Sequence, residues 1–108
     1  MHNWEAGLQL FRAGHYFETH EEWETAWKAA PREERDFYQG MVHLTVALYQ
    51  SGRGNRIAAR SQMRKARKRL FAYGAQCHDI PLDKLVPAVE QAVERRLTGE
   101  RSCLDFGI

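Results

Sequence analysis

The stretch FYQGMVHLTVALYQ, residues 37–50, decides which fold this sequence can adopt. On a helix turning about 100° per residue, its apolar side chains fall on nearly every side, whereas a strand would show alternation of apolar and polar residues. A helix that is apolar all round is normally covered by neighbours on all sides. This segment is therefore predicted to be the central and most buried helix of its domain.

The segments before it also have helical spacing. Trp4, Leu8 and Phe11 recur at i, i+4 and i+7 and precede Gly14, a residue typical of helix C-termini. A second helix is predicted over residues 16–30. The short connection that follows makes it an antiparallel neighbour of the central helix.

The segments after it complete an all-α bundle. Pro31 is expected to be the first residue of the central helix, and Asn55 is a candidate N-cap for a fourth helix ending near residue 73. A fifth segment, 83–97, is expected to bend or break near Pro87. The sequence thus predicts a compact multihelical bundle of five or six helices in one domain, residues 1–108.

Length and composition are those of a small globular protein. The chain has 108 residues, of which 44% are hydrophobic and 28% charged, and this excludes the disordered class. No run approaches the ~18 apolar residues of a membrane span, and the first residues lack the order of a signal peptide. We expect a cytoplasmic protein, no membrane partner, and free thiols at Cys77 and Cys103.

A 40-residue shift aligns two parts of the chain. The aligned pairs are Leu8 with Leu48, Gly14 with Gly54, Trp23 with Met63, and Ala26 with Ala66. Such stacked helical hairpins resemble tetratricopeptide repeats loosely, since the period there is about 34 residues. The alternative is that any hairpin bundle has glycines in its turns and small residues at its crossings.

The second helix has an unusual polar edge. Tyr16, Trp23 and Trp27 form part of its apolar stripe, while His20 and Glu24 line the rim at i, i+4. On the central helix, a polar line can face that rim across a shallow cleft. The residues predicted to form this ligand-binding cleft are Glu18, His20, Glu21, Glu24, Trp27, Gln39 and His43.

Metal binding is one hypothesis for this cleft. His20, Glu21 and Glu24 have the spacing of the zinc-protease motif HExxH with a glutamate last, and His43 would supply a further ligand for a divalent metal. No Glu-x-x-His pair typical of di-metal bundles occurs in the sequence. The alternative is that His20 and Glu24 only pair with each other and with nearby polar groups. Apart from this metal, no cofactor is expected.

Charge is distributed unevenly along the chain. Residues 1–36 carry −4, residues 37–78 carry +8 with no acid at all, and residues 79–108 carry −2. A basic stripe in the middle segment consists of Arg53, Arg56, Arg60, Arg64 and Arg67. Such a stripe can bind nucleic-acid phosphates, but the acidic remainder and the lack of a reader motif favour a solvated face, or one paired with Glu18, Glu21 and Glu24.

Two strings, YFETHEEWETAWK and DFYQGMVHLTVALYQSGRGNRIAARSQMRKARKRL, resemble the bacterial and archaeal family known as domain of unknown function 309. The matching positions are Phe17, Glu18, His20, Glu21, Glu24, Trp27, Tyr38, Gln39, Gly40, Gly54 and Asn55. Tyr38 replaces an aliphatic residue, and His43 stands where a glutamine is expected. The resemblance covers about residues 4–73, not the tail from Pro81. It implies a multihelical all-α domain and no particular activity.

Binding or scaffolding is the function that the sequence favours. The chain has no glycine-rich phosphate loop and no nucleophile motif, so no catalytic residue is proposed, although a glutamate beside a histidine can transfer protons. Stacked hairpins leave grooves that take peptides or helices. Because the middle segment is strongly basic, the expected partner is a protein or peptide with an acidic surface.

Overall fold

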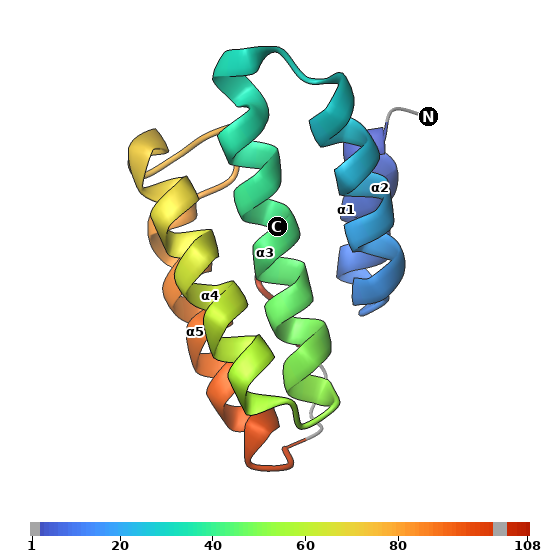
Figure 1. Cartoon of the computed structure of the whole chain (residues 1–108), viewed down its shortest axis with the longest axis vertical. Coiled ribbons are helices and arrows are strands. Elements are labelled where there is room, and N and C mark those ends of the chain that lie inside the picture. The colour runs from blue at the N-terminus through green and yellow to red at the C-terminus, as the bar shows by residue number, and fades with distance from the viewer. Residues whose placement is uncertain (1–2, 101–103) are drawn as a thin grey trace.

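Residues 3–100 and 104–108 are described by the computed structural model, and they form an all-α bundle (Figure 1). The α-helices of this part of the chain are α1 (Asn3–Arg12), α2 (Tyr16–Ala29), α3 (Arg35–Gly52), α4 (Arg56–Leu70) and α5 (Leu82–Leu97). Two short 3-10 helices, η1 (Arg32–Glu34) and η2 (Phe71–Tyr73), precede α3 and follow α4. The predicted fold class is confirmed.

The central position of α3 is also confirmed. Figure 1 shows α3 between the α1–α2 hairpin on one side and α4 with α5 on the other. Phe37, Met41, Leu44 and Leu48 of α3 are fully buried. A helix covered on most sides needs apolar residues on most sides, so the composition of residues 37–50 is the local cause of this arrangement.

The 40-residue shift corresponds to two turns of the same construction. Gly14 and Gly54 have φ angles of 82° and 77°, in the left-handed region that glycine tolerates. The N–H groups of the residues that follow, His15 and Asn55, donate to carbonyl oxygens five residues back at 2.9 and 3.0 Å. Since α2 and α4 begin two residues after these glycines, the two hairpins share their turn geometry.

The prediction for Pro31 was wrong, and the predicted break at Pro87 does not occur. Pro31 has extended ψ (151°) and only caps η1, so α3 begins four residues later, at Arg35. Pro87 does not break the predicted segment, because α5 runs continuously through it. Its missing N–H would have bonded to the carbonyl of Asp83, and both residues are exposed, so water can satisfy that carbonyl.

An aromatic cluster joins the first hairpin to α3. Trp23 is fully buried, and its indole N–H donates to the carbonyl oxygen of Trp4 at 3.1 Å. The two indoles stack with centroids 4.9 Å apart, and Trp4 contacts the ring of Phe37 at 5.4 Å. Trp27, which the sequence places in the same apolar stripe, is only partly buried against this core.

Trp23 can pack this closely only because α1 has a glycine beneath it. A Cβ at Gly7 would overlap the Nε1 and Cδ1 atoms of Trp23. The rigid indole is held by its hydrogen bond and by the stacked Trp4, so it has little room to move away. Gly7 is therefore required by packing rather than by backbone conformation.

Gly7→Ala is expected to destabilise the fold by about 1–3 kcal/mol, as over-packing of a core does, although alanine is the better helix former. Urea unfolding followed by circular dichroism measures this. Gly52→Ala is the matched control, because the added Cβ there meets the end of the flexible Arg96 side chain. Equal stabilities of the two variants would contradict the packing role of Gly7.

Candidate binding site between α2 and α3

The rim of α2 is built around His20. Its Nδ1 lies 2.9 Å from the carbonyl oxygen of Phe17, which can only accept, so Nδ1 carries the proton. Its Nε2 lies 3.7 Å from Oε1 of Glu24, one helical turn away. The ring is thus fixed on one side by the backbone, and when protonated it can donate to the carboxylate.

Beside His20, α2 and the C-terminal half of α3 enclose a hollow of about 240 Å³. The residues that line it are Tyr16, Phe17, His20, Val46, Tyr49 and Gln50. Phe17 stands at its edge with 44% of its surface exposed, and its ring contacts His20 at 5.2 Å and Tyr49 at 5.4 Å. We call this feature the α2–α3 hollow.

Arg53 extends the aromatic wall of the hollow. Its NH1 donates to the hydroxyl oxygen of Tyr49 at 3.2 Å, and its guanidinium lies 5.5 Å from the centroid of that ring. A cation over a ring face is attracted by the ring's negative π-surface. Tyr49 is therefore held between Phe17 and Arg53, and the wall is a pre-formed aromatic surface.

His43 lies apart from this hollow. Its Nδ1 is 2.6 Å from Oε1 of Gln62 on α4. It lines a different hollow of about 410 Å³ together with Asp36, Lys65, Lys68 and Arg69. His43 lies beside α4 because α4 packs closely on α3 at Gly40, where an added Cβ would lie 2.6 Å from the Leu70 side chain. The residues predicted to share one cleft are thus divided, and Glu18, Glu21, Glu24, Trp27 and Gln39 line neither hollow.

The predicted metal ligands are not brought together. Within residues 3–100 and 104–108, no group of three or more His, Cys, Asp or Glu side chains is placed to hold a metal ion. His20 and Glu24 are adjacent, but His43 lies beside α4. Ligand or metal binding at the rim formed by His20 and Glu24 stays a prediction.

Two arginines of the basic stripe pair with carboxylates of α5. Arg60 donates to both carboxylate oxygens of Glu94 at 3.0 and 2.7 Å, and Arg67 lies 2.8 Å from Glu90. The bond from Arg60 lowers the pKa of the Glu94 carboxyl. The suggested pairing with Glu18, Glu21 and Glu24 was wrong, because α3 stands between α4 and α2 (Figure 1).

Sequence reasoning missed the residues that form most of the hollow. Tyr16 is buried with the apolar stripe of α2, as predicted, and also borders the hollow, while Val46 and Tyr49 cannot be distinguished by sequence from the rest of the apolar surface of α3. Phe17 offered a signal, because at about 100° per residue it falls outside the core stripe of α2. A large apolar side chain beyond the buried stripe indicates a surface contact.

A family model described as a domain of unknown function (DUF309) matches residues 4–62. The chain belongs to this family. The resemblance seen in the sequence is thereby confirmed, although the match ends before the predicted boundary at residue 73. All of the residues that line the α2–α3 hollow lie within the matched range.

No curated protein and no solved structure matches the chain. None of the helices in the described part of the chain combines the length and apolar character needed to cross a membrane. Cys77 is a free thiol, while Cys103 lies outside the described residues.

The environment of His43 predicts a pH dependence of stability. Burial lowers its pKa most, the nearby cations Lys65 and Arg69 lower it further, and the bond to Gln62 opposes this. The folded state therefore binds this proton less readily than the unfolded state. The contribution of the neutral ring is present above the ordinary histidine pKa of about 6.5 and is lost as the pH falls below it.

We expect wild type to lose more unfolding free energy than His43→Gln between pH 7.5 and pH 5.5. Glutamine keeps a polar group beside Gln62 but does not titrate, and the other titrating groups are common to both proteins. Chemical denaturation at the two pH values provides the comparison. Parallel losses in the two proteins would show that His43 is not responsible.

Proposed function

We propose that this chain is a binding or scaffolding module that captures one side chain of a protein partner in the α2–α3 hollow. The observation that carries the proposal is Phe17, a large apolar side chain that is half exposed yet fixed by two ring contacts. Aromatic residues at the edge of a pre-formed hollow are typical anchors of protein interfaces. Ordering such a residue in advance lowers the entropic cost of binding.

The size and lining of the hollow favour a single side chain. Its volume of about 240 Å³ is below the ~300–1,000 Å³ range of drug-sized ligand sites. Val46 and the aromatic rings supply apolar contacts, while His20 and Gln50 supply hydrogen-bonding groups. An aliphatic or aromatic side chain fits this chemistry.

The charges around the hollow indicate what should flank that side chain. Glu21 and Glu24 project from the same side of α2 as Phe17, at about 100° per residue. A lysine or arginine beside the apolar anchor would meet these carboxylates. The cytoplasmic location expected from the sequence stays a prediction.

Nucleic-acid binding is the less favoured alternative. Of the predicted stripe, Arg60 and Arg67 are already bonded to carboxylates of α5, and Arg53 is bonded to Tyr49. Those carboxylates would repel phosphates. The arrangement therefore supports a structural role for this part of the stripe.

Peptides selected from a displayed random 12-residue library against the full chain test the proposal. We expect enriched peptides with an aromatic or aliphatic residue next to Lys or Arg. Phe17→Ala should weaken their binding about tenfold or more, because it removes the wall of the hollow. Its effect on folding should be small, since the side chain is half exposed.

Thr25→Ala is the matched control, because Thr25 is exposed on α2 and its hydroxyl donates only to the backbone of Glu21. Isothermal calorimetry on both variants gives the comparison. Peptides that bind Phe17→Ala as tightly as wild type would exclude the hollow as their site.

A further inference from the structure

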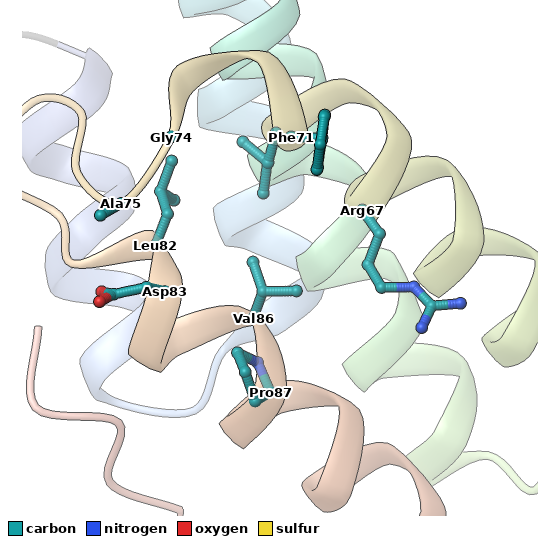
Figure 2. A pocket seen from close by; sticks show the side chains of 9 residues that line it. Arg67, Phe71, Gly74, Ala75, Leu82, Asp83, Val86 and Pro87 are labelled. Atoms are coloured by element: carbon teal, nitrogen blue, oxygen red, sulfur yellow. The ribbon is translucent and has the colours of Figure 1, made fainter.

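A second hollow, of about 380 Å³, lies where α4 and η2 meet the start of α5. Figure 2 shows Val86 and Pro87 of α5 across this groove from Phe71, with Arg67 on the α4 side and Asp83 on the α5 side. Leu70 and Leu82 add further apolar surface. The helices α4 and α5, which line this groove, lie on the opposite side of α3 from α2 (Figure 1).

Phe71 is held outward by the fold. Its side chain is 87% exposed. Tyr73, two residues later, accepts a hydrogen bond from the N–H of Phe37 and donates one to the carbonyl of Glu33, both at 3.0 Å. Because η2 is tied to α3 and η1 in this way, the backbone that carries Phe71 is anchored with this side chain on the surface.

Phe71 continues a stripe on the outer face of α4. Ile57, 86% exposed, lies two heptads before it, and Arg64 lies midway between them. At about 100° per residue the three positions fall within an arc of roughly 40°, and fourteen residues along a helix span about 21 Å. The stripe is therefore apolar at both ends and cationic in its middle.

Charge around this stripe is only partly balanced. The seven cations of α4 are accompanied by no acid on that helix. Arg60, Arg67 and Arg69 pair with Glu94, Glu90 and Asp36. The ion pairs among the described residues do not involve the remaining cations, which are Arg56, Arg64, Lys65 and Lys68.

We propose that the outer face of α4, with the groove at Phe71, binds an acidic amphipathic helix of a partner protein. One apolar side chain of that helix enters the groove beside Phe71, another covers Ile57, and carboxylates between them face Arg64. A helix suits this surface because its own anchors, about four turns apart, match the spacing along α4. This surface is separate from the α2–α3 hollow, so either binding proposal can be disproved without affecting the other.

A nucleic acid fits the surface less well. Leu82, Val86 and Pro87 of the groove offer a phosphate nothing to bind, and Arg67, which also lines it, is already paired with Glu90. Glu90 and Glu94 run beside the stripe and repel a continuous phosphate backbone. They disturb a peptide less, because a peptide can place its carboxylates at Arg64 alone.

A second copy of the chain fits less well too. The most acidic segment, α2, has its apolar stripe buried at Tyr16, Trp23 and Ala26, and its exposed large apolar residue is Phe17 alone. It therefore cannot supply two apolar anchors four turns apart. Self-association is nevertheless an outcome that the experiment must detect.

Fluorescein-labelled 20-residue helical peptides test the proposal by anisotropy titration with the full chain at about 150 mM salt. Each carries two leucines, 11 or 14 residues apart, with glutamates between them. A control peptide of identical composition has its leucines on opposite faces. We expect saturable binding of at least one matched peptide, and binding of the control weaker by about tenfold or more.

Variants of the chain locate the peptide. Phe71→Ser should weaken binding about tenfold or more and Ile57→Ser several-fold, and both side chains are so exposed that folding should be unaffected. Phe17→Ser, at the other hollow, should leave affinity within about twofold. Arg64→Glu should weaken the glutamate peptide about fivefold, and lysine at the facing peptide position should restore it.

Four outcomes of the peptide experiments overturn the proposal. These are no saturable binding of any matched peptide, equal binding of the control peptide, affinity that does not respond to Phe71→Ser, and displacement of the peptide by duplex DNA at comparable concentration. A dimer in sedimentation velocity that dissociates in Phe71→Ser without peptide would assign the groove to a second copy instead, and would equally overturn the proposal.

Discussion

The contact of the Trp23 indole with the backbone of α1 at Gly7 sets the geometry on which the rest of the bundle depends. It brings α1 and α2 to a fixed separation, and the bond from the indole to the carbonyl of Trp4 fixes their relative height. Trp4 also contacts the ring of Phe37, and this contact packs the α1–α2 hairpin against α3. Three helices are thus joined through one cluster whose members cannot shift independently, as close-packed interiors require.

A second close contact at a glycine joins α3 to α4. Gly40 of α3 admits Leu70 of α4 as Gly7 of α1 admits Trp23 of α2. Because both contacts are close, the outer edges of α2 and α4 take definite positions. The α2–α3 hollow and the groove at Phe71 are consequences, since each forms beside a helix whose inner face is fixed. The two surfaces differ in charge, since α2 is acidic and α4 is basic, so they attract partners of opposite charge.

The sequence predicts features that depend on a single segment of the chain. It does not predict features that depend on which helices are neighbours in the fold. The all-round apolar pattern of residues 37–50 identifies the central helix, and Gly14 and Gly54 mark their turns because φ is positive there. The partners of Arg60 and the bond from His43 to Gln62 depend on which helices are adjacent, and spacing along one helix does not contain that information. The anchoring of η2 through Tyr73 depends on Phe37 and Glu33, which lie far away in the chain, and no local pattern reveals it.

A double-mutant cycle between Gly7 and Trp23 tests the central claim most directly. The free energy of unfolding would be measured for wild type, Gly7→Ala, Trp23→Leu and the double variant. If the contact of the Trp23 indole with Gly7 governs the packing, Gly7→Ala should lower the free energy of unfolding much less in the Trp23→Leu background than in wild type. It could even raise it there, because leucine is smaller and more flexible than tryptophan. The coupling should lie within the ~0.5–3 kcal/mol found for contacting residues. An equal cost of Gly7→Ala in both backgrounds would contradict the account.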